Sequence, residues 1–190
     1  MLLFRIKTSW LCEDKGSGAL KKTKSEELVE AINYTEAEKV ANAIAEKEQR
    51  FVFEMDIAIQ RVDNVSAILY QPVLEKDEKL LEGFVNTYFS ADEDSEVGLY
   101  SVKVNATEID ANFKEKETSR IIFIPATSNG EASKLAKLYA KKVLGIPDAR
   151  VKDVKFDRCS AMLLTPGTYE KITKEVELKC GENKINIQLN

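Results

Sequence analysis

Two stretches of this chain nearly repeat each other: RVDNVSAILY at residues 61–70 and KFDRCSAMLL at residues 155–164. They align without gaps at a separation of 94 residues, and Asp63, Ser66, Ala67 and Leu69 meet identical residue types. A single supersecondary unit of this size buries too little apolar surface to be stable alone. The repeat therefore predicts two copies of one unit, each covering what the other leaves exposed.

Each copy is predicted to run strand, strand, helix, strand. Residues 2–11 alternate with a period of two, which is typical of a half-buried strand, and a second strand is expected near 23–33. Thr35 and Glu38 form a capping box that predicts the start of a helix. Residues 51–70 return as a strand with a break near Asp63–Asn64.

The second half repeats this order with strands at 99–109 and 118–125, a capping box of Ser128 and Glu131, and a strand at 149–164. The predicted fold class is α+β: two tandem ββαβ repeats, at 1–70 and 98–165, packed with pseudo-two-fold symmetry. In this prediction the repeated stretch is the last strand of each unit, and its Ser-Ala pair marks a close-packed position.

Two segments lie outside the repeats. Residues 71–97 are predicted to hold a connecting helix at 72–89 and then an acidic linker, whose Asp and Glu residues lack the spacing of a calcium loop. Residues 166–190 alternate on both sides of the turn sequence CGEN, which predicts a C-terminal β-hairpin.

The composition argues against most catalytic chemistry. The chain has no histidine, which excludes Ser-His and Cys-His nucleophiles and His-ligated metals. The segment GSGALKKT has Lys21 where a phosphate-binding loop needs glycine, so a hairpin turn is predicted there. We expect no enzyme activity, no cofactor and no metal.

The location of the protein is predicted from its thiols and apolar runs. Three cysteines without metal-type spacing indicate a reducing compartment. The sequence shows no run of about 18 apolar residues and no signal-peptide pattern at its start. We therefore expect a cytoplasmic protein with no membrane partner.

Three segments resemble a known family. FRIKTSW at 4–10, KKTKSEELVEAINYTEAEKV at 21–40 and YFSADEDSEVGLYSVKV at 88–104 are similar to the family catalogued as domain of unknown function 4494, found in gut bacteria and their phages. The resemblance covers roughly residues 4–165, and the connecting helix and the terminal hairpin depart from it. It implies a phage or mobile-element setting and work near DNA replication, and it supplies no catalytic residues.

The charge distribution suggests a nucleic-acid contact surface. Residues 114–158 hold eleven basic and six acidic side chains, although the whole chain has a net charge of −4. A basic groove of this kind tracks a phosphate backbone, and Trp10, Tyr100 or Tyr139 would offer stacking surfaces. The competing interpretation is that the lysines solvate a helix face while the aromatic residues lie in the core. The predicted contact residues are Lys134, Lys137, Lys141, Arg150, Lys152, Arg5, Lys7 and Lys103. The last three are expected on the solvent side of the first strand of each repeat.

Two functional hypotheses remain open at this point. The first is a non-enzymatic protein that binds single-stranded DNA or RNA in a groove between the repeats, in phage or mobile-element replication. The second is a homo-oligomeric assembly protein, or a protein that binds a host protein, in which the C-terminal hairpin adds to a neighbouring sheet.

Overall fold

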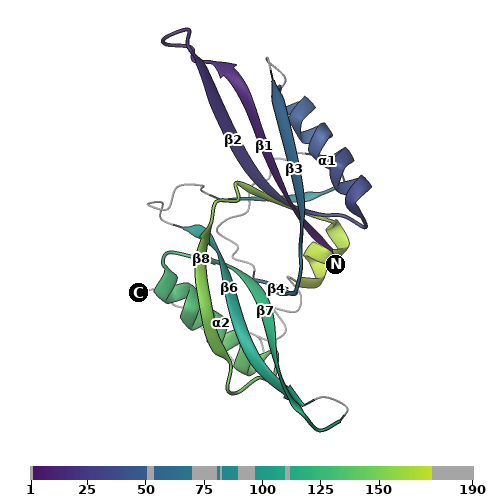
Figure 1. The fold of residues 1–190 in the computed structure, drawn as a ribbon, viewed down its shortest axis with the longest axis vertical. Helices are drawn as coiled ribbons and strands as arrows, with labels where there is room; N and C mark the ends of the chain where they lie inside the picture. The colour runs from purple at the N-terminus through teal and green to yellow at the C-terminus, as the bar shows by residue number, and fades with distance from the viewer. Residues whose placement is uncertain are drawn as a thin grey trace.

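The computed structural model describes residues 2–50, 54–69, 81, 83–89, 97–109 and 112–172 of the chain. They form a mixed α+β fold with two sheets, and the helices lie against the sheets (Figure 1). A further short helical segment covers residues 166–172. The elements in chain order are β1 (Leu3–Glu13), β2 (Leu20–Glu30), α1 (Tyr34–Lys47), β3 (Met55–Val62), β4 (Val65–Ile68), β5 (Val85–Tyr88), β6 (Gly98–Ile109), β7 (Glu115–Ala126), α2 (Asn129–Lys142), β8 (Arg150–Asp157) and β9 (Ala161–Leu164).

The two sheets exchange strands. The first sheet has the order β3-β1-β2-β9-β5 and the second has the order β4-β7-β6-β8. Strand β4 leaves the first half of the chain and pairs in parallel with β7, while β9 leaves the second half and pairs in parallel with β2. Corresponding elements follow one another in the same order in both halves, as the sequence predicts. A gene duplication with pseudo-two-fold packing remains a prediction.

The exchange corrects one expectation. The repeated stretch is not a single last strand, because in each half it spans the end of one strand and the whole of a second, short strand in the other sheet. The predicted break is confirmed: β3 ends at Val62, Asn64 has a φ of 61°, and β4 begins at Val65. Asparagine tolerates this left-handed backbone conformation better than most residues, so the chain turns there into the second sheet.

Both helices begin at capped residues, although one cap differs from the prediction. Asn33, not Thr35, caps α1, since its side-chain oxygen accepts a hydrogen bond of 2.9 Å from the Glu36 amide. Asparagine is the stronger capping residue of the two. Ser128 caps α2 as predicted, accepting from the Glu131 amide.

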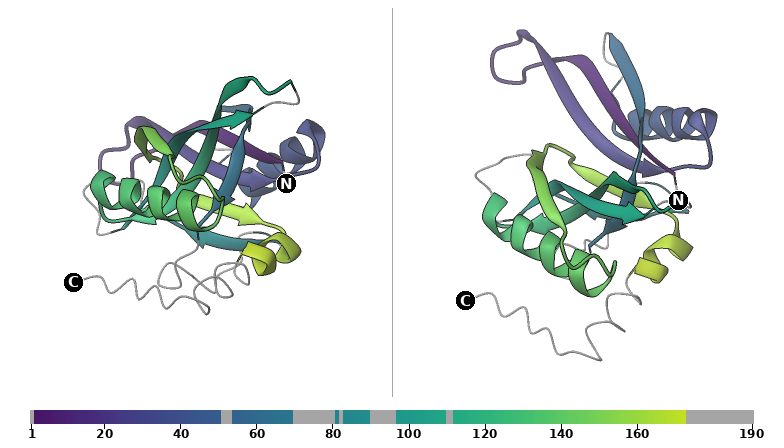
Figure 2. Two further views of the ribbon diagram at one scale, coloured as in Figure 1. Left: turned by 90° about the horizontal axis from the view of Figure 1, so that it is seen from below. Right: turned by 60° about the horizontal axis from the view of Figure 1, so that its bottom comes forward.

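Three apolar clusters hold these layers together. Helices α1 and α2 each lie against one sheet (Figure 2), and one apolar cluster lies between α1 and the first sheet and a second between α2 and the second sheet. The third, which we call the inter-sheet core, joins the sheet faces that lie opposite α1 and α2. Because exchanged strands contribute to it, neither half completes this core alone. Its buried members are Leu3, Leu28, Ile68, Leu99, Phe123, Cys159, Met162 and Leu164.

Two segments outside the repeats differ from the prediction. The end of the predicted connecting helix, Val85–Tyr88, is strand β5 and pairs antiparallel with β9; residues 72–80 lie outside the described residues. The predicted C-terminal hairpin begins instead with the helical segment 166–172. Thr165 precedes this segment and its hydroxyl accepts from the Thr168 amide, while Pro166 suits the first position of a helix. Residues 173–190 lie outside the described residues.

Within the described ranges, no helix is long and apolar enough to cross a membrane.

Candidate nucleic-acid interface

The outer surface of α2 carries a row of lysines. Lys134, Lys137 and Lys141 are exposed, and their spacing of three and then four residues places them on one side of the helix over about 10 Å of its length. The opposite side of α2 packs on the second sheet through Ala132, Ala136 and Ala140, which are buried. These small residues bring the helix close to the sheet and leave the lysines facing solvent.

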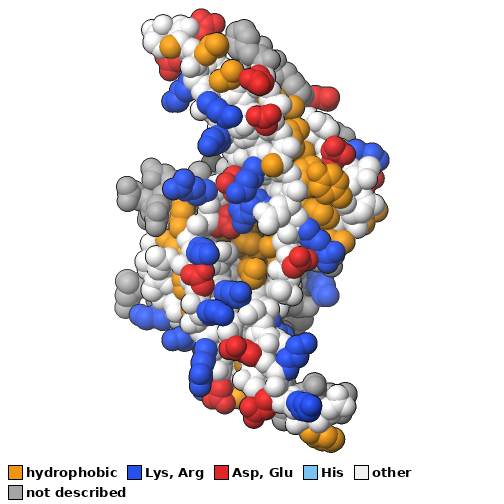
Figure 3. Space-filling view, in the orientation of Figure 1, with side chains coloured by type: hydrophobic (Ala, Val, Ile, Leu, Met, Phe, Trp, Pro, Cys, Tyr) orange, Lys and Arg blue, Asp and Glu red, His pale blue; other side chains and the backbone are white. Residues whose placement is uncertain are grey.

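Strand β8 continues the basic surface. It is an edge strand of the second sheet, it lies beside α2, and both Arg150 and Lys152 are exposed. Arg150 pairs with Asn105 on β6, while Lys152 lies at the bulge where the register of β6 and β8 shifts. Lys and Arg side chains gather along the side of the molecule where β8 and α2 lie (Figure 3). We call Lys134, Lys137, Lys141, Arg150 and Lys152 the α2–β8 basic surface.

These five cations are not neutralised by neighbours. Among the described residues, none of them has an ion pair or a side-chain hydrogen bond. The matching segments of the two halves differ in charge: residues 129–158 hold eight basic and four acidic side chains, a balance of +4. Residues 34–63 hold four basic and seven acidic ones, a balance of −3. Of these two matching segments, only the second therefore carries a net positive charge.

Lys103 lies on the other face of the second sheet. Its neighbours Val102 and Val104 are in the cluster that faces α2, so alternation along β6 directs Lys103 away from the helix. It pairs in register with Ile121 and Asp153. Lys103 is thus separated from the lysines of α2 by the thickness of the sheet.

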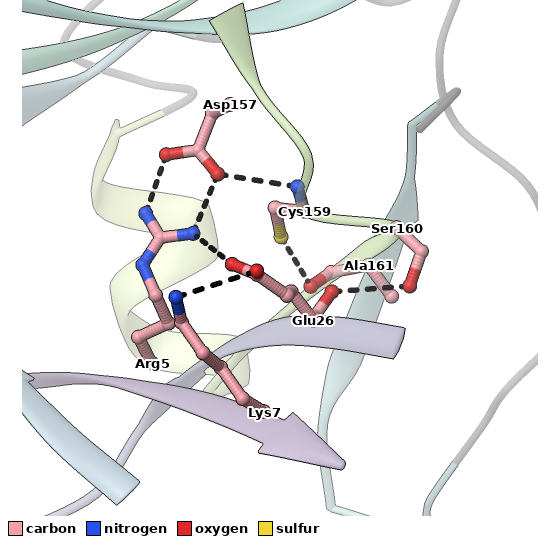
Figure 4. Close-up of polar contacts among 7 residues, drawn as sticks. All are labelled: Arg5, Lys7, Glu26, Asp157, Cys159, Ser160 and Ala161. Carbon is pink, nitrogen blue, oxygen red and sulfur yellow. Dashed lines mark hydrogen bonds and ion pairs between the residues drawn. The ribbon is translucent and has the colours of Figure 1, made fainter. Parts of the chain in front are cut away.

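Arg5 and Lys7 lie where the two sheets cross, next to acidic residues (Figure 4). The Arg5 guanidinium donates to both carboxylate oxygens of Asp157 at 2.7 and 2.5 Å, and to Glu26 at 3.0 Å. Lys7 is half-exposed and forms an ion pair of 3.4 Å with Glu26. The predicted solvent position of Arg5 is wrong, because the face that it shares with Leu3 is covered by the inter-sheet core and only 17% of its side chain is exposed.

This crossing is held by a polar network that joins β1, β2 and the β8–β9 connection. Asp157 also accepts from the Cys159 amide at 3.1 Å, and the Ser160 amide and hydroxyl both donate to the Glu26 carbonyl. Burial lowers the pKa of Arg5, but the hydrogen bond and charge of Asp157 outweigh it, and the pKa is raised. Arg5 is therefore a permanent cation that ties the sheets together, and three of its N–H donors are already used by Asp157 and Glu26.

The predicted stacking residues are only partly available. Tyr100 is buried and makes an edge-on contact with Phe156. Tyr139 packs against the apolar cluster between α2 and the second sheet. Trp10 lies under Arg50, whose guanidinium carbon is 4.9 Å from the ring centre. The sequence prediction missed Phe113, which is 91% exposed at the turn between β6 and β7 and has a φ of 59°. In the sequence, Phe113 could have been identified as an aromatic residue within a turn of charged residues.

A second feature missed from sequence is a buried polar cluster between α1 and the first sheet. Glu27 is buried and its Oε1 accepts from Arg50 at 2.7 Å and from Ser25 at 2.7 Å. Arg50 is also paired with Glu48 and covers Trp10. The cluster fixes the turn after α1 onto the sheet. Thr8 Oγ1, Glu27 Oε2 and Arg50 Nη1 are buried without a hydrogen-bond partner.

The described residues hold no group of three or more Cys, Asp or Glu side chains arranged to bind a metal ion. The fold and the surface together define an α+β protein of two strand-exchanged sheets with one basic edge. The model of the family described as domain of unknown function (DUF4494) matches residues 3–159, and the chain belongs to this family. No curated protein and no solved structure matches the chain.

Proposed function

We propose that this protein binds single-stranded nucleic acid without catalysing a reaction, in phage or mobile-element replication. The observation that carries the proposal is the α2–β8 basic surface, with five exposed cations that have no ion-pair partner among the described residues. Unpaired surface cations bind phosphates because counterions are released from the nucleic acid. The replication setting rests on the family resemblance.

The shape of the surface favours a single strand over a duplex. The lysines lie on the outer side of α2, whereas Arg150 shares the opposite sheet face with Asn105. The basic surface therefore bends around the edge formed by β8. Duplex DNA has a persistence length of about 50 nm and bends at a cost, whereas a single strand follows such an edge freely. The sequence predicted that nucleic acid binds in a groove between the repeats. In this proposal the single strand instead follows the convex edge formed by β8.

The absence of catalysis is also part of the proposal. The chain has no histidine, and the acidic residues at the strand crossing are used in ion pairs and backbone contacts. The second hypothesis, an assembly or host-protein-binding protein that acts through a hairpin at 166–190, loses part of its support because residues 166–172 are helical.

Fluorescence anisotropy with labelled single-stranded and double-stranded oligonucleotides tests the proposal. Five phosphate contacts predict a slope of log affinity against log salt of about −3.5 for a single strand, or about 100-fold weaker binding at 200 than at 50 mM salt. The variant with Lys134→Gln, Lys137→Gln and Lys141→Gln keeps two contacts, so we expect a slope of about −1.4.

A matched control uses α1, in which Lys39 and Lys47 lie 95 residues before Lys134 and Lys142. Lys39→Gln with Lys47→Gln should leave affinity and slope unchanged, since Lys39 is paired with Glu36 in an acidic segment. A flat salt dependence for the wild type, or a triple variant with the wild-type slope, would refute the proposal.

A further inference from the structure

Among the residues that the structure describes, the two sheets present four edge strands, and one of them lacks the features that usually block pairing. Strands β4 and β5 have four residues each, and β8 carries a bulge and two exposed lysines. Short strands, bulges and lysines are the features that prevent edge-to-edge pairing. Strand β3 has eight residues, MDIAIQRV, with no lysine, proline or glycine and no register shift against β1. In the described part of the chain no strand pairs with its second edge, which is therefore available for pairing.

The hydrogen bonds of β3 show which residues face this edge. The Leu11 amide donates to the Glu54 carbonyl, so this pair belongs to the hydrogen-bonded set of the antiparallel ladder. Bonded and non-bonded pairs alternate along such a ladder. It follows that Ala58 bonds to β1, whereas the amides and carbonyls of Ile57 and Ile59 point outward from the sheet.

We propose that a second copy of this chain pairs with β3 antiparallel, with the two-fold axis at Ala58. In this register Ile57 exchanges backbone hydrogen bonds with Ile59 of the partner subunit. By symmetry, Ile59 does the same with Ile57 of the partner subunit. Ala58 meets its own copy in a non-bonded pair, where Cα atoms approach to about 4.5 Å and a small side chain fits. Two five-stranded sheets then form one continuous sheet.

The side chains of β3 are complementary to themselves in this register. Asp56 lies opposite Gln60 of the partner subunit, and Met55 lies opposite Arg61 of the partner subunit. No two like charges face each other, and an amide beside a carboxylate supplies a hydrogen bond. On the α1 side, the half-buried Ile57 and Ile59 side chains meet across the axis and extend the apolar cluster beneath α1.

The test uses charges placed at the axis. Ala58 is exposed, so Ala58→Lys and Ala58→Glu introduce no buried charge into the monomer. In the dimer of each variant, the two copies of residue 58 carry like charges that face each other about 5 Å apart. We expect the dimer dissociation constant to rise about 10- to 100-fold. Mixing the two variants places lysine opposite glutamate and should restore a dimer. Gln60→Lys is the matched control, because it faces Asp56 of the partner subunit and should dimerise like the wild type.

Analytical ultracentrifugation between 1 and 300 µM, with far-ultraviolet circular dichroism to verify folding, distinguishes the outcomes. A wild-type dimer that both charge variants disrupt and that their mixture restores supports the proposal. A monomeric wild type throughout this range overturns it, as do Ala58→Lys dimers of wild-type affinity. The Ala58→Cys variant, in a background with Cys12→Ser and Cys180→Ser, should form an intersubunit disulfide on oxidation. Nucleic-acid binding is measured separately, so failure of either proposal leaves the other standing.

Discussion

Replacing Asp157 is expected to show how strongly the crossing of the two sheets depends on a single ion pair. In Asp157→Ala, Arg5 keeps only its contact of 3.0 Å with Glu26, and the Cys159 amide loses its side-chain acceptor. Breaking a buried pair by removing one partner costs about 3–5 kcal/mol. Arg5 is 17% exposed and retains one carboxylate, which places the ion-pair loss at the lower end of this range.

A buried amide without an acceptor adds about 1 kcal/mol. We therefore expect the free energy of unfolding to fall by about 3–4 kcal/mol, measured by urea denaturation followed by circular dichroism at pH 7. Equal denaturant slopes in wild type and variant would show that the surface exposed on unfolding is unchanged.

The repeat supplies the control. Asp63 stands at the matching position of the first half, where it is 66% exposed and pairs with the exposed Arg61. Exposed pairs contribute about 0–1 kcal/mol, so Asp63→Ala should have little effect. Comparable losses in Asp157→Ala and Asp63→Ala would refute the role assigned to the crossing. The double variant Arg5→Met with Asp157→Leu, which leaves no lone charge, should recover most of the loss.

Two further predictions concern single side chains. Burial raises the pKa of the Cys159 thiol, whose Sγ donates to the Ala161 carbonyl at 2.9 Å, so the thiol stays protonated throughout the neutral range. In a Cys12→Ser, Cys180→Ser background, Cys159 should resist a thiol reagent at pH 8 and react on unfolding; rapid labelling of the native protein would contradict this. If Phe113 stacks on a base, Phe113→Ala should weaken single-strand binding by about 1–3 kcal/mol. Because the change removes no charge, the salt slope should stay constant, and an altered slope or an unchanged affinity would exclude stacking.

Much of the fold could be predicted from local patterns. Alternation located β1 and β6, and the predicted capping boxes located both helices, because these signals depend on neighbours in sequence. The exchange of β4 and β9 could not be predicted this way. The sequence of an apolar strand does not show which sheet the strand joins. The break at Asn64 could be predicted, but not that β4 would pair in the second sheet.

The sequence also predicted some residues of the candidate site correctly and others not. The lysines of α2 are exposed as predicted, because helical spacing separates them from the buried alanines. The position of Arg5 was wrong because alternation shows which residues share a face, but not whether another sheet covers that face. Leu3 on the same face was the available signal. Glu27 gave a similar signal, since it stands in the sequence EELV where an apolar residue would continue the core.

The exchange of strands also sets the order in which a growing chain can complete its sheets. Ser160 donates to the carbonyl of Glu26, a contact across 134 residues, and β9 borders β2 only after this distance has been synthesised. At about 5–20 residues per second, β2 waits roughly 7–27 s on the ribosome with one edge unpaired. The hairpin of β1 and β2 closes early through local contacts, whereas its final neighbour arrives last. A nascent chain of this protein is therefore most open to pairing with other strands at the edge that the finished molecule conceals.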